Sequence, residues 1–282
     1  MQELADKVAV ITGAGSGIGL AIASALSAEG MRVCLADVDG DALTLAKALL
    51  VGGGAAPADI ITRVTDVRLE ADVDGLADRV FTEWGQVDVL VNNAGVFVGG
   101  LLWERPAADL EFVLGVNVWG ILHGIRAFVP RMIAQGGEGH VVNTCSAAGH
   151  LGSPFSGPYG ISKFAALAAT ESLALDLAAT GSTLKVTALC PGMVDTNLAE
   201  GSLAARPDAL ATEATQDRTF AHDMLTQFLT EGISPAAVAT LVVDAIRAEQ
   251  FLVLTHDHHR ALITNRAEEL INGALPAPAD FR

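Results

Sequence analysis

The sequence predicts an α/β fold in which one parallel β-sheet carries helices on both faces. Short apolar runs alternate with helix-type segments along most of the chain, and a glycine-rich loop joins the first run to the first helix. Strands are expected at 7–11, 32–36, 61–65, 88–91, 139–145, 184–190 and 251–254. Helices are expected at 17–29, 40–50, 69–84, 108–134, 157–180, 235–248 and 258–272. Right-handed crossovers then produce a doubly wound sheet of about seven strands, which binds ligands beyond the carboxyl ends of its strands.

The loop after the first strand has the features of a phosphate-binding site. It reads Thr12-Gly-Ala-Gly-Ser-Gly-Ile-Gly19 and lies between an apolar strand and a helix-forming segment. Glycines let backbone N–H groups approach a pyrophosphate, and the helix presents the positive end of its dipole to that anion. Ser16 can add a hydroxyl donor. A merely flexible turn is disfavoured because the strand before and the helix after are both present.

The second strand ends in an acid, Asp37, that predicts the choice of dinucleotide. An acid about 20 residues beyond such a loop accepts hydrogen bonds from the adenosine ribose hydroxyls, and it would repel a 2′-phosphate. Ala14 and Val38 leave no cation beside it to offset that repulsion. Asp37 could instead cap the helix near Gly40, but Asp39 or Asp41 can do this equally well. The pattern therefore favours NAD over NADP.

Tyr159 and Lys163 are four residues apart, and Ser146 lies at the end of an apolar strand upstream of them. Residues at this spacing share one face of a helix, so a phenol and an ammonium would project side by side. A nearby cation favours the phenolate and lowers the tyrosine pKa from its usual ~10. The pair would then exchange a proton near neutral pH. Taken alone, the pair also fits a solvated lysine beside a half-buried ring.

The composition narrows the classes of function. The chain has 282 residues, 51% of them apolar, and a formal charge of −16. The acidic balance argues against nucleic-acid partners and against anionic membrane surfaces. No apolar run reaches the ~20 residues of a membrane span, and the N-terminus lacks the basic start of a signal peptide. Cys34, Cys145 and Cys190 lie in apolar runs as expected for buried thiols, so a single-domain cytoplasmic protein is expected.

Together these residues resemble the single-domain short-chain dehydrogenases/reductases, over nearly the whole chain. The glycine loop matches that family's T-G-x-x-x-G-x-G, and Tyr159 with Lys163 matches its Y-x-x-x-K. Further matches are Asp66-Val67, Asn92-Asn-Ala-Gly95, Asn117, Ser146, and Pro191-Gly192 with Val194 and Thr196. The resemblance implies a Rossmann-type fold that binds NAD(H) and transfers hydride to or from a secondary alcohol or ketone.

The resemblance also implies a role for each catalytic residue. Tyr159 would exchange a proton with the substrate oxygen, and Ser146 would orient that oxygen. Lys163 would bind the nicotinamide ribose and lower the tyrosine pKa, while Asn117 would help hold a water that links Lys163 to solvent. Two plainer alternatives remain, in which Asn117 satisfies backbone groups of its helix and Ser146 caps the next turn.

The cofactor contacts implied by the resemblance run the length of a dinucleotide. Asp66 would touch the adenine and Asn92 the adenosine ribose, while the stretch from Pro191 to Thr196 would grip the nicotinamide carboxamide. The full expected set is Gly13, Ser16, Gly17, Ile18, Gly19, Asp37, Asp66, Val67, Asn92, Gly95, Tyr159, Lys163, Pro191, Gly192, Val194 and Thr196. The competing functions are an NADPH-dependent carbonyl reductase and a cofactor-binding regulator without turnover.

The segment 195–234 is expected to form a substrate lid. Its apolar residues either close over an apolar substrate or pack the lid on the body; they are Leu198, Leu203, Leu210, Phe220, Met224, Leu225 and Phe228. Other possible pocket walls are Phe97, Trp103, Phe155 and Met193, and His150 and Ser153 offer polar groups near the site.

The C-terminal part of the chain allows fewer conclusions. The cluster from His256 to His259 follows the last strand and is expected to be a solvated helix start capped by Asp257 rather than a metal site. The tail, 258–282, either covers the pocket or makes a subunit contact. The resemblance implies pairing through helices 108–134 and 157–180, and hence a homodimer or homotetramer.

Overall fold

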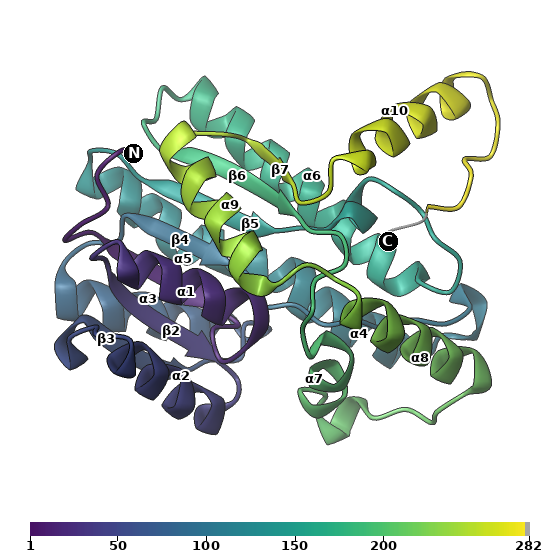
Figure 1. The fold of residues 1–282 in the computed structure, drawn as a ribbon, viewed down its shortest axis with the longest axis horizontal. Helices are drawn as coiled ribbons and strands as arrows, with labels where there is room; N and C mark the ends of the chain where they lie inside the picture. Colours follow the sequence, from purple (N-terminus) through teal and green to yellow (C-terminus); the bar gives the residue numbers. More distant parts are fainter. Residues whose placement is uncertain (280–282) are drawn as a thin grey trace.

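Seven parallel strands form one sheet, as predicted (Figure 1). The structure, a computed structural model, describes residues 1–279. The sheet order is β3-β2-β1-β4-β5-β6-β7, so the strand order reverses between β1 and β4. Each predicted strand is confirmed to within one residue: β1 (Val8–Thr12), β2 (Arg32–Asp37), β3 (Ile60–Val64), β4 (Val89–Asn92), β5 (His140–Thr144), β6 (Lys185–Cys190) and β7 (Leu252–Leu254). Ligands of such sheets bind at the carboxyl edge beside the reversal point.

Two helical layers enclose the sheet. One face is covered by α1 (Gly17–Ala28), α2 (Gly40–Gly52) and α9 (Pro235–Ala248), and the other by α3 (Glu70–Trp84), α5 (Gly120–Gln135) and α6 (Gly157–Ala179). Side chains alternate across a strand, and β1 shows this directly. Ala9 and Ile11 join the core under the first layer, while Val8 and Val10 join the core under the second. Burial on both faces explains why the strands are almost continuously apolar.

The helix predicted at 108–134 is three segments rather than one. It consists of α4 (Ala107–Leu114), the π-helical turn η3 (Gly115–Trp119) and α5. π-Helical turns insert an extra residue and often occur at functional sites. The turn carries Asn117. By length and composition, the continuous helical stretch Ala107–Gln135 is apolar enough to span a membrane, although no apolar run of that length was predicted. In its most apolar 18 residues, however, 61% are buried inside the fold, as in a core helix.

The lid region contains two helices that the sequence pattern did not resolve. They are α7 (Leu198–Ala204) and α8 (Gln216–Thr230), joined through the short 3-10 turn η5 (Asp208–Leu210). Both lie beyond the carboxyl edge of the sheet, near α4 (Figure 1). The chain then returns to the body through α9.

The last helix, α10 (His258–Ile271), leaves the end of β7 and projects from the body (Figure 1). Asp257 occupies the N-cap position as predicted, but its side chain makes no capping hydrogen bond. The predicted solvation of this helix start is wrong at His259, which is fully buried. The segment after α10 turns back, and the Ala279 N–H donates to the Gly152 carbonyl at 3.1 Å. Residues 280–282 of the predicted tail lie outside the described part of the chain.

Candidate active site

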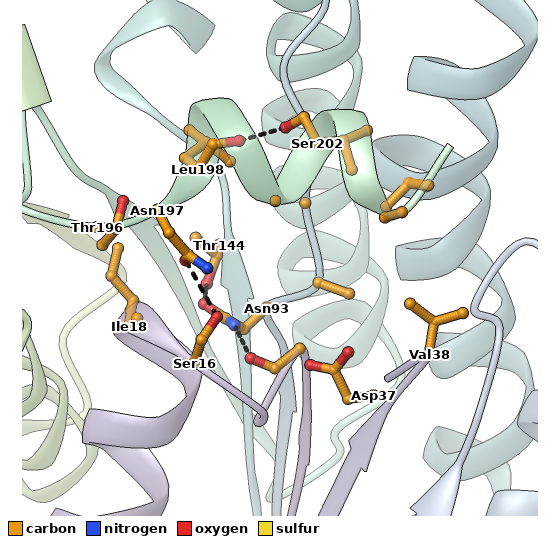
Figure 2. Close-up of a pocket in the computed structure, with 18 of the residues that line it drawn as sticks. Ser16, Ile18, Asp37, Val38, Asn93, Thr144, Thr196, Asn197, Leu198 and Ser202 are labelled. Atoms are coloured by element: carbon orange, nitrogen blue, oxygen red, sulfur yellow. Dashed lines mark hydrogen bonds between the residues drawn. The ribbon is translucent and has the colours of Figure 1, made fainter. Parts of the chain in front are cut away.

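A groove of about 720 Å³ runs along the carboxyl edge of the sheet, beneath α7 (Figure 2). Loops after β1 to β6 all contribute to its walls. Most of the residues predicted to hold the cofactor line it: Gly13, Ser16, Gly17, Ile18, Asp37, Asp66, Val67, Gly95, Tyr159, Lys163, Pro191, Gly192, Val194 and Thr196. Gly19 and Asn92 are the two predicted members that do not.

The glycine loop has no room for a side chain at Gly13 or Gly19. Gly13 has a φ of +65°, and a Cβ added there would lie 2.8 Å from the Ala94 Cα. A Cβ added to Gly19 would lie 2.1 Å from the Gly13 carbonyl oxygen. Gly19 therefore lets α1 pack against the loop, which explains why it is needed although it lies outside the groove. The resulting cradle of bare backbone at a helix N-terminus fits a pyrophosphate.

Asp37 lies at the end of β2 and points into the groove (Figure 2). Its carboxylate accepts hydrogen bonds from the Gly15 N–H at 2.9 Å and the Asp39 N–H at 3.1 Å. Asp39 is the residue that caps α2, because its side chain accepts from the backbone N–H groups of Asp41 and Ala42. Asp37 is therefore not the helix cap.

The structure differs from the prediction at Asn92. Its side chain is buried and donates to the Asn143 carboxamide oxygen at 2.8 Å. The neighbouring Asn93 lines the groove instead, and its Nδ2 donates to the Thr12 carbonyl at 3.0 Å. Asn92 is the last residue of β4, and Gly124 leaves space for it because a Cβ there would lie 2.0 Å from its Oδ1. We therefore replace Asn92 with Asn93 among the groove residues.

Three of the four proposed catalytic side chains converge where the groove ends. Ser146 lies against the Tyr159 side chain, and its Oγ accepts from the Ala148 N–H at 3.1 Å. It thus caps the short turn after β5, as the plainer alternative proposed, while it also contacts the phenol. The Lys163 Nζ donates to the Thr144 carbonyl at 2.9 Å and lies 5.7 Å from the Tyr159 ring centroid.

Burial, rather than the neighbouring cation, dominates the acid–base properties of this pair. Loss of solvent raises the pKa of Tyr159 to about 12, although the contact with Ser146 acts in the opposite direction. Loss of solvent also lowers the pKa of Lys163 to about 8. The prediction that Lys163 depresses the tyrosine pKa is therefore wrong for this structure. The phenol carries its proton here and is ready to donate it.

Asn117 is fully buried in the π-helical turn. Its Oδ1 accepts from the Val96 N–H at 2.8 Å, and its Nδ2 donates to the Val96 carbonyl at 2.9 Å and to the Ser162 Oγ at 2.9 Å. It ties the loop after β4 to α6. The alternative that Asn117 satisfies backbone groups of its own helix is therefore wrong, because these partners lie outside that helix.

A smaller apolar cavity of about 100 Å³ adjoins the groove at Tyr159. Its walls include Phe97, Phe155 and Met193, as predicted, and Ser153. From the lid it receives Leu198, Met224, Leu225 and Phe228. The other expected members lie elsewhere: Trp103, Leu203 and Phe220 are largely exposed, Leu210 packs against the core, and His150 contacts the Cys190 Sγ at 3.6 Å. The lid therefore both covers a pocket and packs on the body.

Phe155 has a strained backbone beside this cavity. Its φ is +59°, in the left-handed region that bulky residues avoid. The Phe155 carbonyl accepts from the Gly100 N–H at 2.7 Å, and its ring stands edge-on to Phe220 of α8 with 5.1 Å between centroids. The surrounding contacts hold an aromatic ring in the cavity wall despite the unfavourable backbone.

A buried ion cluster fastens the lid to α4. Asp109 is fully buried and pairs with Arg105 at 3.4 Å, with Arg206, and with Arg218 at 3.8 Å. It also accepts from the Thr212 hydroxyl at 3.0 Å. The last three partners belong to the lid, so three points on it converge on one carboxylate.

Several groove residues were not predicted. The Ser16 hydroxyl donates to the Asn197 carboxamide oxygen at 3.2 Å, which links the glycine loop to the start of α7 (Figure 2). Ser202 of α7 and Arg206 also line the groove. Asn93 and Asn197 directly follow predicted residues and could have been found, whereas no pattern marks the two lid residues.

Comparisons with known proteins agree with this geometry. The short chain dehydrogenase family profile matches residues 7–207. A 1-deoxy-11-beta-hydroxypentalenate dehydrogenase of Streptomyces exfoliatus is 35% identical over 281 residues, which cover 99% of this chain and 94% of that protein. A C alpha-dehydrogenase of Sphingobium sp. is 29% identical, with 99% and 90% covered.

Solved structures show the same relationship. A short chain dehydrogenase/reductase of Burkholderia phymatum in complex with NAD has a TM-score of 0.95, with 41% identity and 99% of both chains covered. An actinorhodin polyketide ketoreductase with NADPH has a TM-score of 0.75, with 29% identity, 92% of this chain and 99% of that chain covered. The fold, the glycine cradle and these matches together place the chain in the short-chain dehydrogenase/reductase family of oxidoreductases, which bind a nicotinamide cofactor.

Proposed function

We propose that this chain is an NAD(H)-dependent dehydrogenase/reductase of secondary alcohols and ketones with apolar substituents. One observation carries the proposal: Ser146 and Tyr159 line both the groove and the smaller apolar cavity. A dinucleotide in the first and a substrate in the second would therefore meet at these two side chains. Such convergence is what a proton exchange coupled to hydride transfer requires.

The chain's own residues supply position and a proton. The bound NAD would accept or donate the hydride. Ser146 orients the substrate oxygen, and Tyr159 gives it a proton in reduction or takes one in oxidation. Lys163 holds the nicotinamide ribose. Asn117 keeps the loop after β4 in place. By holding that loop, it also maintains the path by which Lys163 exchanges protons with water.

The preference for NAD rests on charge at the adenosine end. Asp37 presents a carboxylate to the groove, and Val38 beside it is apolar. The arginines among the described residues of the groove wall are both committed, since Arg68 pairs with Asp66 and Arg206 pairs with Asp109. A 2′-phosphate would meet one carboxylate and no unpaired cation. The competing NADPH-dependent reductase is disfavoured for this reason.

The proposed substrate class follows from the smaller cavity. Apart from Ser146, Ser153, Ser156 and Tyr159, its described lining is apolar or backbone, and none of it is ionised at pH 7. A desolvated charge on the substrate would have no partner there. We also propose a cytoplasmic location, since the acidic surface favours neither membranes nor nucleic acids.

We propose a homodimer or homotetramer paired through α5 and α6. Exposed apolar side chains lie on and beside these helices, including Trp119, Ile133, Ile161 and Leu175. Burying such side chains between subunits is favourable, and small residues on α6 allow close helix approach. Light scattering at micromolar concentration should therefore give a dimer or tetramer. A monomer would contradict the proposed assembly.

The deciding experiment is a screen of secondary alcohols with NAD at alkaline pH, following NADH by absorbance. Turnover is expected, and Tyr159→Phe should lower kcat at least ~100-fold, while NADH affinity is largely kept. Lys163→Ala should lower both kcat and NADH affinity. Lys185→Ala, at an exposed lysine that starts β6, should change neither quantity. Near-normal turnover in Tyr159→Phe would refute the acid–base assignment. NADH binding without turnover of any alcohol or ketone would favour the regulator.

A further inference from the structure

Behind the nicotinamide end of the groove lies a histidine cluster that the proposed chemistry does not use. It consists of His256, His258 and His259, at the end of β7 and the start of α10. The ring centroids are 5.2 Å apart for His256 and His259, and 4.4 Å apart for His258 and His259. Among residues 1–279, no group of three or more metal-ligating side chains is arranged to hold a metal. The cluster therefore requires a different explanation.

The cluster packs directly on Gly192. A Cβ added to Gly192 would lie 2.5 Å from the His259 Cε1 and 2.7 Å from the His256 Nδ1. Gly192 lines both the groove and the apolar cavity, and Pro191 before it does the same. The backbone at this corner of the site is therefore pressed against imidazole rings on its other side.

A chain of hydrogen bonds joins the Gly192 backbone to His256. The Gly192 N–H donates to the Thr255 Oγ1 at 3.0 Å, and this hydroxyl lies 2.8 Å from the His256 Nδ1. Because the hydroxyl already accepts from Gly192, it can donate its own proton to His256 when Nδ1 carries a lone pair. That arrangement needs a neutral imidazole with its proton on Nε2.

We propose that Thr255 and His256 are positioning residues that hold the Pro191–Gly192 backbone at the nicotinamide end of the site, and that they do so with a neutral His256. This inference rests on the proposed NAD-dependent function. Glycine is required at position 192 because the rings of His256 and His259 occupy the space that a side chain would need. Protonation of His256 would turn Nδ1 into a donor and leave the Thr255 hydroxyl proton without this acceptor.

The surrounding charges agree with a neutral ring at pH 7. Burial, followed by the neighbouring His258, lowers the pKa of His256. The other titratable groups nearby are His259 in the cluster and the exposed Asp257 and Arg260 in the same turn of α10. On the segment that precedes Gly192, the titratable group is Cys190, which contacts His150. A group with a depressed pKa loses its contribution as pH falls, so the support for Gly192 should weaken below the usual histidine pKa of ~6.5.

The test uses three variants of the full chain and one control. Thr255→Val removes the hydroxyl at nearly constant volume, and His256→Ala removes the acceptor. His256→Asn places a carboxamide oxygen where the histidine has Nδ1, but it cannot be protonated. Thr264→Val, which removes an exposed hydroxyl from α10 outside the cluster, is the matched control and should change neither measurement. NADH affinity is measured by fluorescence from pH 5.5 to 8, and deuterium exchange of the Gly192 segment is measured in the cofactor-free protein.

Thr255→Val and His256→Ala should each weaken NADH binding roughly 3- to 10-fold, the effect of one lost hydrogen bond, and should speed exchange at Gly192. His256→Asn should bind NADH as the wild type does at pH 8 and should lose less affinity in acid. Wild-type affinity and exchange in both Thr255→Val and His256→Ala would overturn the proposal, as would an asparagine variant as weak as the alanine variant. If the wild type does not bind NADH, the proposed function fails, while the exchange measurement still tests the positioning role.

Discussion

The two cavities that meet at Tyr159 are built in different ways. The nucleotide groove is built on short local motifs: its loop has no room for a side chain at Gly13 or Gly19, and its key acid, Asp37, is held by backbone N–H groups. The apolar cavity is walled by long side chains from four separate segments, and its lid is fastened by buried ions. A backbone cradle depends on short local motifs, whereas a side-chain pocket depends on contacts between distant residues.

This difference predicts where substitutions will act. Changes in the groove should alter which cofactor binds and leave folding nearly intact. Changes at the lid's attachments should alter stability first and selectivity second. The expected effects below run from the largest to the smallest.

Asp109→Ala should cause the largest loss of stability. It would leave Arg206 and Arg218 at a buried site without their anion, while Arg105 would keep Asp217 at 2.9 Å, and breaking a buried pair in this way typically costs about 3–5 kcal/mol. The free energy of unfolding in urea should fall by that amount. Glu111→Ala, at an exposed acid on the same helix, is the control and should change little. Equal stability of the two variants would mean that the cluster does not hold the lid.

Asp37→Ser with Val38→Arg should change cofactor choice without a comparable loss of stability. The wild type is expected to favour NAD over NADP by roughly 100-fold in kcat/KM, about 3 kcal/mol, because Asp37 repels a 2′-phosphate. The double variant removes that carboxylate and adds a cation, so the ratio should narrow or reverse. Steady-state kinetics with both cofactors measures it. Equal use of both cofactors by the wild type would show that Asp37 does not contact the ribose.

Phe155 gives the smallest and most local test. At a φ of +59°, an L-residue is strained by roughly 1–2 kcal/mol, and glycine is not. Phe155→Gly should therefore be more stable than Phe155→Ala by about 1 kcal/mol, although glycine is usually the less stable choice. Thermal unfolding of the two variants compares them directly, since both lack the ring. If alanine is the more stable, the backbone at this position is not strained.

The same contrast explains what the sequence could predict. All seven strands, the glycine loop and the position of Tyr159 with Lys163 follow from local periodicity and spacing, and the structure agrees with them. The lid helices were missed because their apolar residues divide between pocket, core and solvent, as Leu225, Leu210 and Phe220 illustrate. Nothing in the spacing of Asp109 and Arg206, which lie in separate segments, indicates that they meet.

Two other errors have physical causes. Asn92 and Asn93 both fit one motif, but only the structure shows which side chain turns into the core toward Asn143. The tyrosine pKa was predicted from its cation alone, whereas burial is the largest cause of the shift in both members of the pair. Burial depends on residues distant in the sequence, such as Phe97 against the Tyr159 ring, so it could not be inferred from a helix spacing.

Tyr159 lies where the two cavities join, and it is the only tyrosine in the chain, so its titration is the most direct test of the account. Phenolate absorbance then reports this residue alone, and Tyr159→Phe supplies the blank. The pKa of Tyr159 is raised to about 12 by burial, so the cofactor-free protein should show no phenolate near pH 10, where an exposed tyrosine ionises. Bound NAD⁺ brings a positive nicotinamide ring to the groove and should move phenolate formation to lower pH. Ionisation near pH 10 in the free protein, or a curve that NAD⁺ does not move, would contradict the claim that Tyr159 links nucleotide binding to proton exchange.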